Sequence, residues 1–153
     1  MKILMVCLGN ICRSPLAEGI LKQKIEQEGL DWEVDSAGTS NYHAGEGPDN
    51  RSITVGSKYG IDISTQHSRQ FRRDDFKMFD KIYVMDSSNY QNVVKLAESE
   101  VDKAKVNLIM NEVQANRNIN VPDPYWGNDG FEQVYQMLDE ACNKIVEHYT
   151  ALT

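Results

Sequence analysis

The chain has 153 residues, of which 41% are hydrophobic and 25% charged, a composition typical of one globular domain. Its formal net charge of −7 argues against nucleic acid or an anionic membrane as a partner. Three cysteines, Cys7, Cys12 and Cys142, are too few for a disulfide framework, and the three histidines are scattered without metal-ligand spacing. Signal-peptide and lipidation patterns are not recognisable. We therefore expect a single cytoplasmic domain over residues 1–153 that binds no metal.

Apolar segments alternate along the chain with segments of helical periodicity. Residues 3–6 (ILMV) have the composition of a buried strand, and hydrophobic residues at helical spacing follow from Ser14 to about Gly29, with Lys and Glu on the other face. Further strands are predicted at 32–38, 81–86 and 105–110, and further helices at 51–59, 87–98 and about 128–149. This alternation predicts an α/β domain, with a parallel sheet covered on both sides and functional loops at the carboxyl ends of the strands.

The loop after the first predicted strand has the features of an anion site. In residues 6–15 (VCLGNICRSP), five residues separate Cys7 from Arg13, and Ser14 and Pro15 are suited to cap and begin the next helix. At such a junction the N–H groups of residues 8–13 converge on one tetrahedral anion, and the helix end favours a thiolate. The planar guanidinium of Arg13 matches two phosphate oxygens. A buried structural cysteine is the alternative, but the combination favours a nucleophile, with phosphate held by Leu8, Gly9, Asn10, Ile11, Cys12, Arg13 and Ser14.

Two other residues have both a structural and a functional interpretation. Cys12 is either a small buried residue or a second thiol that forms a reversible disulfide with oxidised Cys7. Asp123, in the segment VPDP, is either a turn residue or the acid that protonates a leaving oxygen. Rigid prolines would hold Asp123 in place, and a nearby thiolate would favour its protonated form, so we predict the acid role.

Residues 6–18 (VCLGNICRSPLAE) resemble the signature of the low-molecular-weight protein tyrosine phosphatases. The likeness continues in order through residues 34–40 (VDSAGTS), 84–89 (VMDSSN) and 123–126 (DPYW), and therefore spans nearly the whole chain. It implies a single domain with three α/β/α layers and a four-stranded parallel sheet in the order 2-1-3-4. A phosphate-binding loop would follow the first strand.

The same resemblance implies supporting roles around the loop. Asn10 and Ser36 would bond to each other and hold the loop in shape, Ser14 would donate to the sulfur of Cys7, and Asp86 would support the loop from behind. The family often has a histidine at the position of Gln66, so either Gln66 or a shifted His67 takes its place. We expect Arg69, Arg72 and Arg73 to be solvated. Positions that line the pocket entrance in the family match Leu8, Ile11, Tyr42, Tyr125 and Trp126, although such aromatic residues are usually ordinary surface or core residues.

The predicted activity is hydrolysis of phosphotyrosine without metal or cofactor, through a phosphocysteine intermediate. Cys7 would attack phosphorus while Arg13 holds the oxygens, and Asp123 would act first as acid and then as base. A phenol, with a pKa of about 10, leaves more readily than a serine alkoxide. Expected partners are a phosphotyrosine-containing protein, inorganic phosphate as product or inhibitor, and a tyrosine kinase.

Three other functions fit parts of the sequence. A protein-arginine phosphatase has a similar sequence but typically carries threonine where Ile11 stands, so Ile11 favours phosphotyrosine. A thioredoxin-linked arsenate reductase needs additional cysteines in mid-chain, and none lies between Cys12 and Cys142. A non-catalytic phosphate-binding module would be expected to lack one of the three catalytic residues, all of which are present.

Overall fold

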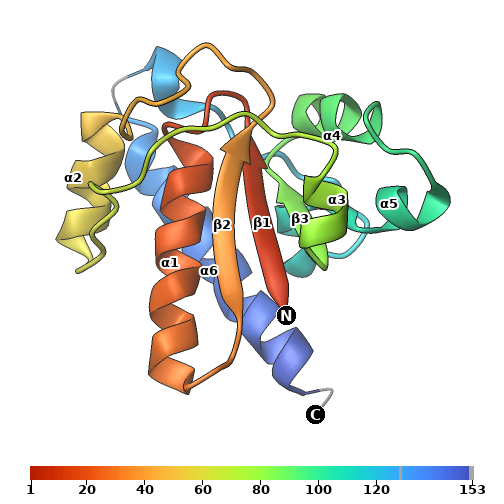
Figure 1. Ribbon diagram of the computed structural model, residues 1–153. Helices are drawn as coiled ribbons and strands as arrows, with labels where there is room; N and C mark the ends of the chain where they lie inside the picture. The colour runs from red at the N-terminus through yellow and green to blue at the C-terminus, as the bar shows by residue number, and fades with distance from the viewer. Residues whose placement is uncertain (128, 152–153) are drawn as a thin grey trace.

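Figure 1 shows the computed structural model of the protein, which describes residues 1–127 and 129–151. Four parallel strands form one sheet in the order β2-β1-β3-β4, with bounds β1 Lys2–Cys7, β2 Glu33–Gly38, β3 Lys81–Val84 and β4 Val106–Leu108. This confirms the predicted single-domain α/β fold and its strand order. Leu152 and Thr153, at the end of the predicted domain, lie outside the described residues.

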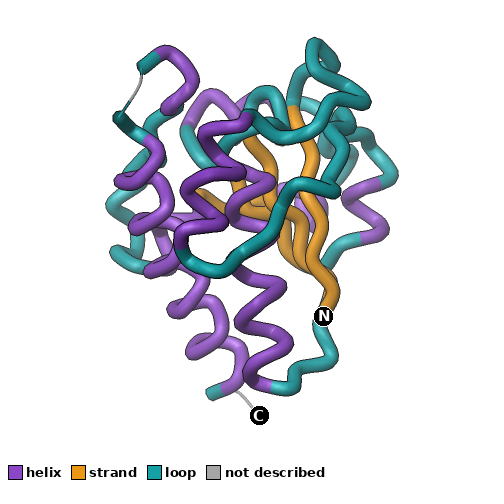
Figure 2. Tube along the Cα trace, turned by 90° about the vertical axis from the view of Figure 1, so that its left-hand side faces the viewer, coloured by secondary structure: helices purple, strands orange, loops and turns teal. Residues whose placement is uncertain are grey.

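Helices cover both faces of the sheet, because alternate residues of the central strand point to opposite sides. Ile3 and Met5 of β1 pack in one core cluster with α1 (Arg13–Glu28), α2 (Asn50–Lys58) and α6 (Phe131–Thr150). Leu4 and Val6 pack in a second cluster with α3 (Asp75–Met78) and α4 (Ser87–Val94). Figure 2 shows the strands lying between these helical segments. The helix α5 (Glu100–Ala104) lies beside β4, at the edge of the sheet.

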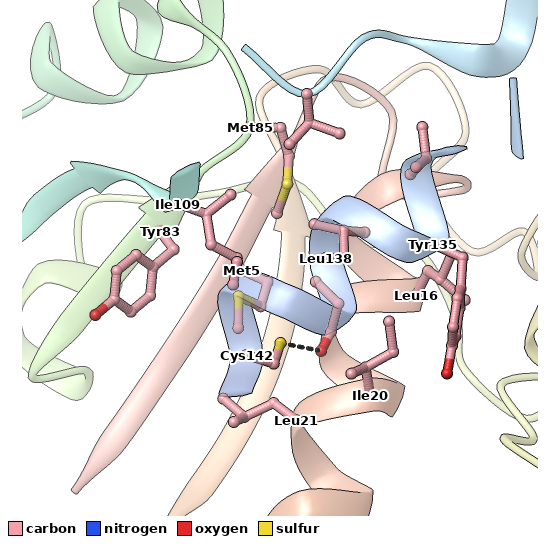
Figure 3. Close-up of a cluster of buried hydrophobic side chains, with 14 of the residues drawn as sticks. Met5, Leu16, Ile20, Leu21, Tyr83, Met85, Ile109, Tyr135, Leu138 and Cys142 are labelled. Atoms are coloured by element: carbon pink, nitrogen blue, oxygen red, sulfur yellow. Dashed lines mark hydrogen bonds between the residues drawn. The ribbon is translucent and has the colours of Figure 1, made fainter. Parts of the chain in front are cut away.

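The larger core cluster holds the first and last helices together. Figure 3 shows Leu16, Ile20 and Leu21 of α1 facing Leu138 and Cys142 of α6, with Met5 and Met85 beside them. All seven side chains are fully buried. The Cys142 thiol donates to the carbonyl of Ala17 across the interface at 3.9 Å. Cys142 is therefore a packed core residue between α1 and α6.

The strand register brings the carboxyl ends of three strands to one edge of the sheet. Cys7 pairs with Gly38 of β2, and the preceding residue Val6 pairs with Val84 of β3. Residues 8–12, between β1 and α1, therefore lie above the sheet between the ends of β2 and β3, at the top of Figure 1. We call this segment the 8–12 loop.

Several predicted boundaries differ from those in the structure. The first helix begins at Arg13, one residue before the predicted Ser14 cap, and no side chain caps it. Asp86, predicted as the end of a strand, is the N-cap of α4, since its carboxylate accepts from Asn89 N at 2.8 Å. The fourth strand stops at Leu108, where a 3₁₀ helix (Ile109–Glu112) begins. The predicted start of the last helix, Asn128, lies outside the described residues, and the helix is described from Phe131.

Two short helices, α3 and α5, were not predicted, because four or five residues are too few to show a hydrophobic period. Among the described residues, none of the helices has both the length and the apolar character that crossing a membrane requires.

Candidate active site

The carbonyl groups of Cys7 and of the 8–12 loop, with the exception of Gly9, accept hydrogen bonds from neighbouring segments that the structure describes. Five carbonyls accept hydrogen bonds of 2.8–3.0 Å: Cys7 from Thr39 N, Leu8 from Ser40 N, Asn10 from Ser68 Oγ, Ile11 from Asp49 N and Cys12 from Ser52 Oγ. In contrast, the N–H groups of residues 8–12 have no acceptor among the residues that the structure describes. The loop therefore keeps its donors open, which is the arrangement of an anion-binding nest.

Asn10 fixes the turn of this loop. Its φ of 56° lies in the left-handed region, which a side chain tolerates best when it hydrogen-bonds locally. The amide Nδ2 donates to Ser14 Oγ at 2.8 Å and to Ser36 Oγ at 3.0 Å, and Oδ1 accepts from Arg69 N at 3.0 Å. Three segments far apart in sequence thus hold one strained residue in place.

A buried carboxylate extends this network. Ser36 Oγ donates to Glu18 Oε1 at 2.7 Å, and Glu18 is only 7% exposed, although its helix was expected to present Glu to solvent. Burial raises the pKa of Glu18, and the hydrogen bond from Ser36 opposes that shift. Sequence periodicity did not single out Glu18, because charged residues at that spacing usually lie on a solvated helix face.

Cys7 lies at the floor of the site, and the residue is 2% exposed. Its Sγ is 3.0 Å from Ser14 Oγ, which also lies 3.4 Å from the carbonyl of Ala37. These contacts explain why Ser14 does not cap the helix: its hydroxyl is turned toward the sulfur and the loop.

Arg13 is buried beside the loop with two partners on one nitrogen. Nη1 donates to Asp86 Oδ2 at 2.7 Å and to the carbonyl of Val121 at 2.9 Å. Nη2 lies 3.7 Å from Asp123 Oδ2. Both hydrogens of Nη1 are used, so Nε and Nη2 are the donors left for an anion.

These groups share one cleft of about 410 Å³. Its floor is Cys7 and Arg13, while Tyr42 and Trp126 are 82% and 81% exposed and form its mouth. Asp123 lies in the wall, at the N-cap of a 3₁₀ helix (Pro124–Trp126), where Oδ1 accepts from Tyr125 N at 3.0 Å. The complete lining is Cys7, Leu8, Gly9, Ile11, Cys12, Arg13, Ser40, Tyr42, His43, Asp123, Tyr125 and Trp126. A thiol, a guanidinium and a carboxyl group thus meet beneath an aromatic opening.

The family model of the low molecular weight phosphotyrosine protein phosphatases matches residues 2–152. The chain belongs to this family. A putative low molecular weight protein-tyrosine-phosphatase from Synechocystis is 42% identical over 149 residues, covering 95% of this chain and 94% of the relative.

Solved structures agree with this assignment. A protein tyrosine phosphatase from Entamoeba histolytica superposes with a TM-score of 0.92 at 38% identity, covering 99% of this chain and 97% of the other. An arginine phosphatase from Drosophila gives a TM-score of 0.90 at 33% identity, with 97% and 98% covered. The protein is therefore a phosphatase, and relatives on its fold carry the names of both tyrosine and arginine phosphatases.

The structure brings together all the residues that the sequence assigned to the phosphatase site. Leu8, Ile11, Tyr42, Tyr125 and Trp126 line the cleft. Ser36 lies behind the loop, and Asp86 contacts Arg13. Cys12 is buried and its thiol is free, and burial, with Asp49 nearby, raises its pKa well above the usual value.

The position at which the phosphatase family often has histidine does not support the loop here. Gln66 Nε2 donates to the carbonyl of Pro15 at 3.0 Å, and His67 is exposed. The hydroxyl of Ser68 and the backbone of Arg69 contact Asn10 instead.

The prediction that Arg69 is solvated is wrong, whereas Arg72 and Arg73 are exposed. Arg69 is half-buried, and its guanidinium pairs with Asp75 at 3.1 Å and Asp35 at 3.2 Å. These two ion pairs hold the segment whose backbone reaches Asn10.

Sequence reasoning also missed His43, Ser40 and Arg51. His43 and Ser40 line the cleft, and the Arg51 guanidinium donates to the carbonyls of Gly127 at 2.6 Å and Tyr125 at 3.2 Å. Ser40 ends the segment 34–40 that resembles the phosphatase family, whereas His43 and Arg51 belong to no pattern that would mark them.

Proposed function

We propose that the protein is a protein-tyrosine phosphatase that works in two steps through a phosphocysteine intermediate. The observation that carries the proposal is a single cleft lined by Cys7, Arg13, Asp123 and the 8–12 loop, whose N–H groups are open. Each group has the chemistry that one part of phosphate-ester cleavage requires.

In the first step the Cys7 thiolate attacks phosphorus in line with the ester oxygen. The loop N–H groups and the free Nε and Nη2 donors of Arg13 bind the three equatorial oxygens, where negative charge accumulates. An S–P bond forms as the P–O bond breaks, and Asp123 gives its proton to the departing phenolate. The products are the free phenol and phosphocysteine.

In the second step Asp123, now a carboxylate, takes a proton from water, which attacks phosphorus. The S–P bond breaks and inorganic phosphate leaves. The Ser14 hydroxyl, 3.0 Å from Cys7 Sγ, is placed to donate a hydrogen bond to the departing sulfur. Inorganic phosphate fits the same loop and would therefore inhibit as a product.

The aromatic opening favours phosphotyrosine as the substrate. Tyr125 and Trp126 pack edge to face with ring centroids 4.9 Å apart, and Tyr42 stands exposed in the same lining. Such rings contact a flat phenyl group over a large area. The side chain of the wall residue Ile11 offers no hydrogen bond to a guanidinium group, which supports phosphotyrosine over phosphoarginine.

We further propose a cytoplasmic location, in keeping with three free cysteines, and a tyrosine kinase as the enzyme that supplies the substrate.

The experiment is a comparison of phosphotyrosine and phosphoarginine peptides with the wild-type protein and the Cys7→Ser variant. We expect the wild type to prefer phosphotyrosine and Cys7→Ser to be folded but inactive. A preference for phosphoarginine would instead favour the second candidate function, protein-arginine phosphatase. The observation that favours this candidate is the similarity to the Drosophila arginine phosphatase. Full activity of Cys7→Ser would exclude the cysteine mechanism.

A further inference from the structure

His43 stands in the cleft with one nitrogen occupied and the other unoccupied. Nδ1 lies 3.1 Å from Glu46 Oε2, and a carboxylate only accepts, so Nδ1 carries a hydrogen in this contact. No hydrogen bond to Nε2 occurs among the described residues. In the neutral ring Nε2 is therefore an open acceptor.

The Nε2 edge of the ring is turned toward the 8–12 loop. A methyl group added at Gly9 would lie 3.1 Å from His43 Cδ2 and 3.9 Å from Nε2. The same methyl group would lie 3.6 Å from Ile11 Cγ1, and His43 and Ile11 line the same cleft. Because glycine has no side chain at position 9, the His43 imidazole can pack closely against the loop.

The ring also belongs to the row of aromatic side chains around the cleft. Its centroid lies 4.8 Å from that of Tyr42 and 6.2 Å from that of Tyr125. The His43 side chain is 19% exposed, whereas its neighbour Tyr42 is 82% exposed. Glu46, Tyr42 and the 8–12 loop therefore hold His43 on three sides. Its imidazole adds a polar edge between the aromatic rings of Tyr42 and Tyr125.

We propose that His43 is a specificity-determining residue that recognises the peptide main chain of the substrate, with Nε2 accepting a hydrogen bond from the N–H of the phosphotyrosyl residue. The inference builds on the proposed function, because it requires a phosphopeptide whose phosphate is bound in the 8–12 loop. The donor is a group that every phosphotyrosine peptide has and that p-nitrophenyl phosphate lacks. His43 thus separates protein substrates from small aryl phosphates.

The test compares kcat/KM for a phosphotyrosine peptide with kcat/KM for p-nitrophenyl phosphate. His43→Phe keeps a ring between Tyr42 and Tyr125 but has no acceptor, while His43→Gln retains a polar group near the position of Nε2. One hydrogen bond corresponds to about fivefold in affinity. We expect His43→Phe to lower the peptide-to-aryl-phosphate ratio about fivefold, mainly through KM, and His43→Gln to restore much of it.

A peptide methylated at the phosphotyrosine nitrogen isolates the proposed contact. The methylated peptide lacks the N–H donor. Wild type and His43→Phe should therefore have the same ratio of kcat/KM for this peptide to kcat/KM for p-nitrophenyl phosphate. Two results would overturn the role of His43. One is a lower ratio in His43→Phe than in wild type even with the methylated peptide. The other is a loss of kcat/KM in His43→Phe that is as large for p-nitrophenyl phosphate as for the unmethylated peptide.

His148→Phe is the matched control. His148 also contacts a glutamate, Glu112, at 3.1 Å and stacks on an aromatic ring, Tyr149, but lies in the last turn of α6 outside the cleft. Its substitution should leave the ratio unchanged. A wild-type protein that hydrolyses p-nitrophenyl phosphate but no phosphotyrosine peptide would refute the proposed function itself, whereas peptide hydrolysis with an unchanged ratio in His43→Phe would refute only the role of His43.

Discussion

Asp86 accepts a hydrogen bond from Arg13 Nη1 at 2.7 Å and, through its other oxygen, caps α4 by accepting from Asn89 N at 2.8 Å. One carboxylate thus ties the buried guanidinium to the end of β3. The arrangement occupies both hydrogens of Nη1 and leaves Nε and Nη2 as the donors for an anion. The pose of the arginine is therefore set by the sheet rather than by the ligand.

The first prediction separates the two functions of Asp86. Asp86→Asn keeps a cap and an acceptor, whereas Asp86→Ala loses both and leaves the buried Arg13 guanidinium with Asp123, 3.7 Å away, as its carboxylate partner. Removing one partner of a buried ion pair costs about 3 kcal/mol, so we expect that loss for Asp86→Ala and roughly 1 kcal/mol for Asp86→Asn. Urea unfolding measures the free energies, and kcat/KM should fall about tenfold or more in Asp86→Ala.

A second N-cap provides the control for Asp86. Ser99 Oγ caps α5 by accepting from Asp102 N at 3.1 Å, away from the cleft. Ser99→Ala should cost about 1 kcal/mol of stability and leave kcat/KM unchanged. If Asp86→Ala behaved like Ser99→Ala, the carboxylate would act only as a cap.

The second prediction concerns the close approach of β2 to the 8–12 loop. A methyl group at Gly38 would lie 2.8 Å from Leu8 O and 3.0 Å from Asn10 N, both backbone atoms that cannot move without distorting the loop. We expect Gly38→Ala to destabilise the protein by about 1–3 kcal/mol and to lower kcat at saturating substrate. Gly127→Ala is the control, because an added methyl group there meets nothing within 4 Å. Equal activity of the two variants would show that the loop accommodates the added group.

The third prediction follows from the raised pKa of Glu18. Between the ordinary pKa of 4.5 and the higher folded-state value, the folded protein binds more protons than the unfolded chain, so stability falls as pH rises through this window. Glu18→Gln keeps an acceptor for Ser36 without this titration. We therefore expect the stability of Glu18→Gln relative to wild type to increase from pH 4 upward and to level off above the folded-state pKa.

Urea unfolding across this pH range tests the Glu18 assignment. The charged groups that act on Glu18 are Asp35, Lys22 and Arg69, and none of them is altered in the variant. Glu26→Gln, on the exposed face of the same helix, controls for the loss of one negative charge. A stability difference that does not change with pH would contradict the buried carboxylate as its source.

The sequence predicted the parts of the molecule that follow a local rule. Short apolar segments identified the four strands, the helical period of apolar residues identified the long helices, and the spacing of Cys7 from Arg13 identified the loop. The outward hydrogen bonds of the loop were not predictable, because their donors, such as Thr39 and Ser68, lie in irregular segments without a period. His43 was missed for the same reason, since its role depends on where a loop folds back.

The last prediction concerns Cys12 as a partner for oxidised Cys7. Burial and the nearby carboxylate of Asp49 raise the pKa of Cys12 well above its usual value, so the thiolate that would attack a sulfenic acid on Cys7 is scarce at neutral pH. If Cys12 is the resolving thiol, peroxide-treated wild type should regain activity with dithiothreitol, while Cys12→Ser should recover less as Cys7 oxidises further. The rate of disulfide formation, followed by mass spectrometry, should rise steadily between pH 7 and 9, a window chosen below the raised pKa.

Cys142→Ser controls for the loss of a buried thiol, because Cys142 lies in the core between α1 and α6. Equal recovery of Cys12→Ser and wild type would remove Cys12 from the redox chemistry and leave it as a packing residue.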